Sequence, residues 1–191
     1  MNMRTKTFFI AGLMLAVAGR LMAREATALE LIKAGDPYVG IQSKDKVLQI
    51  RSEKSIASLT PDVWHVVYYD PSTGMKSVEV TFEAGKETDM SHPARPFQLP
   101  YHESDILDRS KLKVDSDVAL KKAASQPLLK NLTLKASQLT LDHSDVGPVW
   151  KIRLWAAKLN NPDKQVDIGL ITLSATDGSI VKSDLRPDRV D

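Results

Sequence analysis

The chain has 191 residues, of which 42% are hydrophobic, and its 26 Lys and Arg residues nearly balance its 24 Asp and Glu residues. This composition is typical of one or two modest globular domains and unlike that of a disordered or fibrous chain. There is no cysteine, which excludes disulfide frameworks, thiolate metal sites, cysteine nucleophiles and a lipid anchor on cysteine. A net charge of +2 gives no indication of a nucleic-acid partner.

The first 23 residues have the layout of a secretory signal peptide. A short cationic region precedes an uninterrupted apolar run over residues 8–18, which is shorter than the roughly 20 residues of a stable membrane-spanning helix. Small residues at Ala18 and Ala23 suit cleavage. We therefore expect a signal peptide within residues 1–23 that is cleaved after Ala18 or Ala23. The remaining chain would be a periplasmic or secreted protein without a stable membrane span; an uncleaved anchor is the alternative.

Residues 24–86 predict a first small unit, in which a helix precedes three or four antiparallel strands. Apolar residues recur at helical spacing over residues 28–32. Further along, a strand is predicted around Trp64, where side chains alternate between the two faces of a sheet. This alternation places Trp64 in the core and directs His65 and Tyr69 to the opposite face.

Residues 87–110 are predicted to form an extended connector between two units. Three prolines between residues 93 and 100 remove backbone amide donors and exclude a helix or a central strand. The aromatic residues Phe97 and Tyr101 make the segment too apolar for a freely solvated tether. We therefore expect the connector to lie across one of the units.

Residues 111–191 predict a second unit that repeats the pattern of the first. Asp115 or Ser116 is the expected N-cap of a short helix, and Pro127 is expected to stop it. An alternating strand around Trp150 follows, and two turns then join it to two further strands. Trp150 is therefore the counterpart of the first core tryptophan.

The outward faces of the two tryptophan strands carry the candidate binding residues. Trp155 falls on the face opposite Trp150, beside Lys151 and Arg153. An aromatic ring among cations is a common feature of protein-binding surfaces. We expect these outward faces to form the contact between the units or a protein-binding surface, made of Lys151, Arg153, Trp155, His65 and Tyr69.

The sequence shows no pattern typical of catalysis or of a metal site. The four histidines are dispersed, and none belongs to an HExxH arrangement. Residues 102–105 contain metal-ligand residue types, and residues 142–145 contain the residue types of a hydrolase triad. Adjacent side chains on one short loop, however, cannot face each other in series as the nucleophile, base and orienting group of a triad. We therefore predict that the chain is not an enzyme and has neither a cofactor nor a metal ion.

The two predicted units resemble the PepSY domain. The likeness rests on Val149-Trp150-Lys151-Ile152 and the later Asp177-Gly178 turn with its closing strand, and on Trp64-His65-Val66 with the turn at residues 70–74. PepSY domains pair an amino-terminal helix with a small antiparallel sheet, and they occur in secreted bacterial proteins and in propeptides of thermolysin-like peptidases. The resemblance implies an α+β fold of two such units, each with one helix packed on a three- to four-stranded antiparallel sheet. A cystatin-like fold of another family is the alternative with the same motifs.

The same resemblance implies a role in binding, because the proposed role of the family is to modulate or inhibit peptidases. We expect a protein that interacts with or restrains a peptidase or another envelope protein, for instance by presenting an edge strand to an extended peptide. The alternative is a carrier of a small ligand, with its pocket between helix and sheet. The oligomeric state is not predicted.

Overall fold

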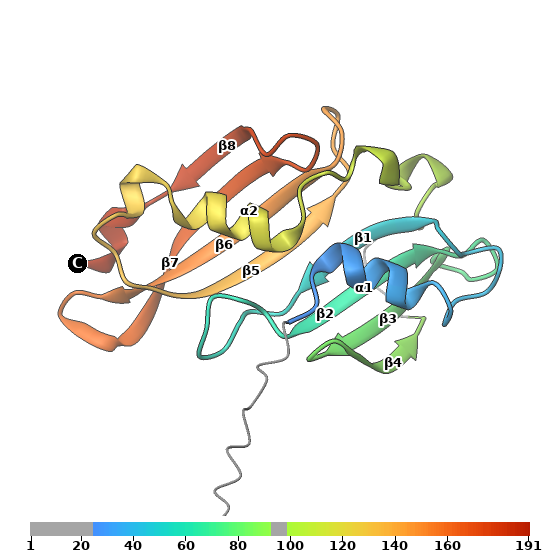
Figure 1. The fold of residues 1–191 in the computed structure, drawn as a ribbon, viewed down its shortest axis with the longest axis horizontal. Coiled ribbons are helices and arrows are strands. Elements are labelled where there is room, and N and C mark those ends of the chain that lie inside the picture. Colours follow the sequence, from blue (N-terminus) through green and yellow to red (C-terminus); the bar gives the residue numbers. More distant parts are fainter. Residues whose placement is uncertain (1–24, 93–98) are drawn as a thin grey trace, which may run out of the picture.

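The computed structural model describes residues 25–92 and 99–191 (Figure 1). The predicted signal peptide and the proline-rich centre of the predicted connector lie outside the described residues. In the described ranges the helices are α1 (Ala28–Gly35) and α2 (Ser116–Ala124), and the strands are β1 (Val47–Ser52), β2 (Val63–Tyr69), β3 (Ser77–Glu83), β4 (Lys86–Ser91), β5 (Leu134–Asp142), β6 (Val149–Lys158), β7 (Asn161–Ser174) and β8 (Ile180–Leu185).

The strands form one eight-stranded antiparallel sheet in the order β4-β3-β2-β1-β5-β6-β7-β8. The first half consists of α1 and β1 to β4, and the second half of α2 and β5 to β8. The halves meet where β1 pairs with β5, at Ile50 opposite Leu141 and Arg51 opposite Thr140. The fold is α+β, as predicted, but the sheet is continuous, whereas the sequence predicted a separate sheet for each unit.

Serine hydroxyls extend the junction beyond these paired residues. Ser52 Oγ accepts a hydrogen bond from the amide of Leu139 at 2.9 Å, and Ser55 Oγ accepts one from the amide of Ser137 at the same distance. The amide of Ser55 in turn donates to the carbonyl of Ser137 at 2.8 Å. Because buried amides need partners, these side chains let the two half-sheets join where the regular ladder ends.

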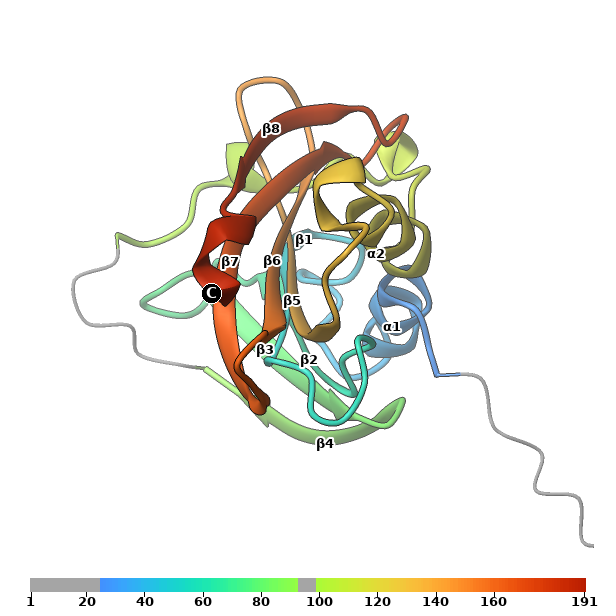
Figure 2. The same ribbon diagram turned by 90° about the vertical axis from the view of Figure 1, so that its left-hand side faces the viewer.

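Both helices cover the same face of the sheet, and their N-termini meet above the junction (Figures 1 and 2). Asp115, the N-cap of α2, accepts hydrogen bonds through Oδ1 from the amides of Ser116 at 2.7 Å and of Leu29 at 3.1 Å. Ser116 Oγ accepts from the amide of Ala28 at 3.0 Å. Asp115 and Ser116, at the start of α2, thus satisfy first-turn amides of α1 that have no partner within their own helix.

A continuous apolar core between the helices and the sheet contains both predicted tryptophans. Trp64 on β2 is 3% exposed, and Trp150 on β6 is fully buried. Each indole N–H donates to a backbone carbonyl, that of Pro61 at 3.0 Å and that of Val114 at 2.8 Å. The prediction that these rings point into the core is confirmed.

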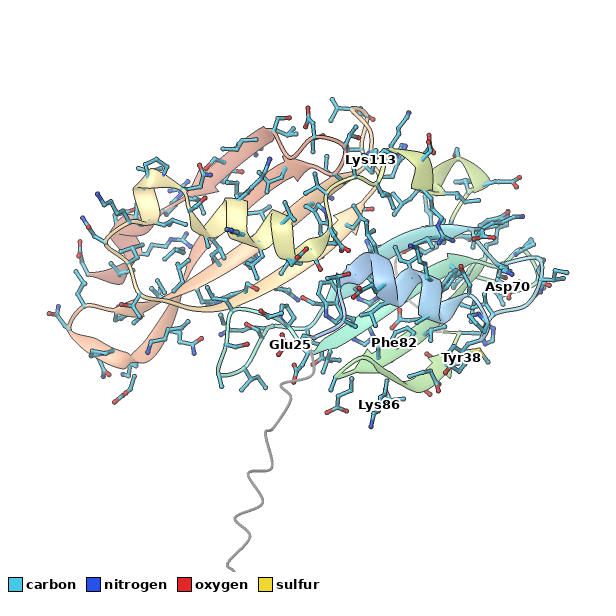
Figure 3. All side chains as sticks on the ribbon, viewed as in Figure 1. Glu25, Tyr38, Asp70, Phe82, Lys86 and Lys113 are labelled. Carbon is cyan, nitrogen blue, oxygen red and sulfur yellow. The ribbon has the colours of Figure 1, made fainter. Side chains whose placement is uncertain are left out.

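The C-terminal end of α1 is held close to the first half of the sheet. Tyr68 Oη donates to the carbonyl of Ile32 at 2.7 Å. A Cβ at Gly35 would stand 2.2 Å from the same hydroxyl, so glycine is required for this close approach. Beyond the helix, Tyr38 packs edge-on against Phe82, with 6.5 Å between the ring centroids (Figure 3).

Strand β4 occupies the start of the segment predicted as connector. It follows β3 through a hairpin at Ala84 and Gly85, which both have positive φ. The predicted boundary at residue 87 therefore falls inside a sheet-edge strand. The sequence concealed this strand because most of its side chains are exposed, so it lacks the apolar alternation of a half-buried strand.

The described remainder of the connector lies across the first half of the sheet, as its apolar residues predicted. Tyr101 and Ile106 pack on the face opposite the helices. The amide of Leu107 donates to the carbonyl of Val47 at 2.7 Å, and its side chain enters the main core. The segment therefore passes from one face to the other beside the start of β1, and it joins the second half at Lys113 (Figure 3).

Candidate functional site

The face of the sheet opposite the helices brings charged and aromatic side chains of both halves onto one surface, which we call the open face. Alternation along the strands assigns residues to it, because their neighbours point into the main core. It runs through both halves, since Arg51 and Thr140 are paired across the junction. Its residues include Arg51, His65, Glu79, Thr81, Gln138, Thr140, Lys151, Arg153, Trp155, Asp167 and Thr172.

In the first half, the open face is organised around the buried carboxylate of Glu79. Arg51 donates two hydrogen bonds to it, each 2.9 Å long. His65 Nδ1 lies 3.0 Å from Glu79 Oε1 and carries the hydrogen, since a carboxylate only accepts. On the other side of the ring, His65 Nε2 lies 3.6 Å from Glu53 Oε1. These contacts link β1, β2 and β3 in a fixed arrangement.

The environment of Glu79 strongly favours its charged form. Burial by itself raises the pKa of Glu79, but hydrogen bonds from His65 and Arg51, together with the Arg51 charge, outweigh this and lower the pKa to about 2 from an ordinary value of 4.5. The group is therefore a carboxylate at neutral pH. A carboxylate held in this way is suited to orienting Arg51 and His65 and unsuited to accepting a proton in general base catalysis.

In the second half, the open face presents Trp155 among paired charges. Arg153 pairs with Asp167 at 2.6 Å, and Lys151 pairs with Asp142 at 2.8 Å. The ammonium of Lys54, from the loop after β1, lies 4.7 Å from the centroid of the Trp155 ring, within the range of a cation–π interaction.

Of the five predicted binding residues, four are partly or fully accessible on the open face and one is covered. Trp155, Lys151 and His65 are half-buried, and Arg153 is exposed. Tyr69, in contrast, is 8% exposed and packs under Tyr101 and Ile106 of the connector. Tyr69 is therefore a packing residue and does not belong to the accessible surface.

The structure adds residues that the sequence did not single out. Arg51 on β1 and Glu79 on β3 form their ion pair across the intervening strand β2, and this pairing depends on the order of the strands. A signal was present, because Glu79 is a charged residue between the apolar residues Val78 and Val80. The contact of Lys54 with Trp155 depends on the β1–β5 junction and had no sequence signal.

The two polar segments considered for chemistry form local turns. Ser144 Oγ donates to the carbonyl of Gly147 at 2.6 Å, and Asp142 pairs with Lys151. In the other segment, Asp105 accepts a hydrogen bond from the amide of His102 at 2.8 Å. Within residues 25–92 and 99–191, no group of three or more His, Asp or Glu side chains is arranged to hold a metal ion.

The hollow beneath the N-termini of the two helices is small. Thr27, Trp64, Leu120 and Leu139 contribute to its lining, and its volume is about 30 Å³. A space of this size holds a water or two, whereas small-molecule sites typically measure roughly 300–1,000 Å³. A carrier pocket between helix and sheet, the alternative prediction, has no support at this position.

Comparison with protein-family models, with curated proteins and with solved structures finds no match to this chain. Among the described residues, none of the helices is both long enough and apolar enough to span a membrane.

Proposed function

We propose that this chain is a secreted or periplasmic, non-enzymatic binding protein that acts through the open face. It is built from two PepSY-like units, and its partner is a peptidase or another protein of the bacterial envelope. The single observation that carries the proposal is the open face itself, a strand surface on which Trp155 and fixed ion pairs from both halves stand opposite the helix-covered core.

The order of elements supports the two-unit part of the proposal. Each half has one helix followed by four antiparallel strands, with its core tryptophan on the second strand. The turn at residues 70–74 lies between the second and third strands, whereas residues 176–178 lie between the third and fourth. The likeness between the halves therefore rests on the tryptophan strands, and the counterpart of the Asp177-Gly178 turn is Ala84-Gly85.

The chemistry of the open face supports a protein partner. Aromatic and arginine side chains are the residues that most often dominate protein–protein affinity, and Trp155 and Arg153 lie on the same strand. Arg153 is already paired with Asp167, and the nearby Lys151 is paired with Asp142, so these two cations lose little freedom when a partner binds. A preorganised polar surface around an aromatic anchor fits binding better than catalysis or transport of an apolar ligand.

Capture from an envelope fraction tests the proposal. The immobilised chain is compared with the Trp155→Ala and Arg153→Ala variants, with each captured protein quantified by mass spectrometry. We expect at least one protein to bind the unmodified chain and to be reduced roughly tenfold or more with each variant, as expected for the loss of a central aromatic or arginine contact.

The matched control is Lys121→Ala on the exposed surface of α2. It removes a cation from the helix side of the molecule, opposite the open face. It should leave capture unchanged. Loss of capture with Lys121→Ala, together with full capture by Trp155→Ala and Arg153→Ala, would place the binding surface on the helix side and refute the proposal.

A further inference from the structure

We propose that two copies of this chain associate through β8, in an antiparallel pairing centred on Ser183. This inference goes beyond the proposed function and concerns the edge of the sheet at β8. Strand β8 is the last strand of the sheet, and no described strand pairs with its outer side (Figure 1). An edge of this kind is a template for pairing with another chain.

Some backbone hydrogen-bonding groups of β8 point away from β7, where they can pair with a second copy of the chain. The amide of Arg186 donates to the carbonyl of Ile168 at 2.7 Å, so the backbone groups of Arg186 point toward β7. Backbone groups alternate between the two sides of a strand. Those of Asp184 and Lys182 therefore also point toward β7, and those of Ser183 and Leu185 point outward.

A two-fold pairing centred on Ser183 is complementary in charge. When Ser183 lies opposite its copy and exchanges hydrogen bonds with it, Lys182 of each copy lies opposite Asp184 of the other. These are non-hydrogen-bonded positions, at which facing side chains approach most closely. The side chains of Lys182 and Asp184 are 69% and 51% exposed, and within one chain they already lie 2.7 Å apart. The pairing thus forms an ion pair on each side of the axis.

Exposed apolar side chains at the β8 edge also favour pairing with a second copy of the chain. Ile180 and Val181 are 49% and 46% exposed at the start of β8. Val181 also borders a surface hollow with Val146, which is 74% exposed. The opposite edge lacks the charge complementarity of β8, since a pairing centred on Thr88 of β4 would place Glu87 opposite Asp89 of the other copy and oppose like charges.

Sedimentation velocity over a range of protein concentrations tests the proposal. We expect the unmodified chain to shift from monomer to dimer as its concentration rises. Lys182→Asp and Asp184→Lys each place like charges opposite one another on both sides of the two-fold axis. Each variant should therefore raise the dimer dissociation constant by about tenfold or more. The double variant Lys182→Asp/Asp184→Lys restores opposite charges and should restore the dimer.

A backbone variant and an opposite-edge variant complete the test. Ser183→Pro removes an amide that points away from β7, so it should abolish the dimer and leave the thermal melting of the monomer nearly unchanged. Lys86→Asp on β4 should leave the dimer intact. A chain that is monomeric at every concentration, a dimer that survives both single charge reversals, or a double variant that stays monomeric would overturn the proposal.

Discussion

At the residue scale, Glu79 shows how an acidic side chain is accommodated in a sheet. It lies between two buried valines on β3, where an unpaired charge would be strongly unfavourable. Two hydrogen bonds from Arg51 and one from His65 compensate for the lost hydration. The cluster therefore stabilises the fold and also fixes the charges that the open face presents.

We predict that Glu79→Gln lowers the free energy of unfolding at neutral pH by on the order of 2 kcal/mol. Because folding lowers the pKa of Glu79 from 4.5 to about 2, its stabilising contribution is fully present above pH 4.5 and is lost as the pH falls toward 2. Chemical unfolding of both proteins across this range checks the prediction. Their stabilities should converge at low pH, and a constant difference would contradict this account.

At the element scale, the shared cap at Asp115 couples the two helices. One carboxylate oxygen of Asp115 accepts hydrogen bonds from a backbone amide of α1 and from one of α2. The first turn of each helix therefore depends on the same side chain. An ordinary N-cap contributes about 1 kcal/mol. A cap that serves two helices, with a negative charge at two helix N-termini, should contribute more.

We therefore predict that Asp115→Ala destabilises the protein by about 2 kcal/mol, whereas Asp115→Asn, which keeps an acceptor oxygen, costs about half as much. Denaturant unfolding measures both values. Asp117→Ala, an exposed acid in the first turn of α2, is the matched control. If Asp115→Ala costs no more than this control, the two helices do not share a cap.

Some strands of this sheet could be predicted from the sequence and others could not, depending on whether burial leaves a periodic pattern in the residues. Trp64 and Trp150 were found because half-buried strands leave a period of two in the sequence. Strand β4 was missed because an exposed edge strand leaves no such period. The β1–β5 junction depends on the hydroxyls of Ser52 and Ser55, and two serines carry no information about a contact with residues more than eighty positions away.

The candidate surface could be predicted from the sequence only in part. Alternation correctly put Trp155, Arg153 and His65 on the face opposite the core, because each strand determines its own two faces. It could not show that the connector covers Tyr69, nor that Lys54 lies over Trp155, because both contacts depend on how loops cross the sheet. Sequence patterns therefore located the surface, and the fold determined which of its residues are accessible.

At the scale of the whole molecule, joining the halves through β1 and β5 turns two narrow sheets into one wide surface. The helices gather on one side (Figure 2), and the open face on the other side is continuous across the junction at Arg51 and Thr140. A partner larger than a short peptide can therefore contact both halves at once. This geometry, more than any single residue, is the basis of the proposed binding role.

Site-specific photo-cross-linking in living cells tests this claim most directly. A photoreactive amino acid is introduced at Thr81 or Thr172, which place it on the open face in the first and second half, and at Lys121 on α2 as the control. We predict that the same envelope protein is cross-linked from both open-face positions and not from position 121. Cross-linking from position 121 alone would contradict the account.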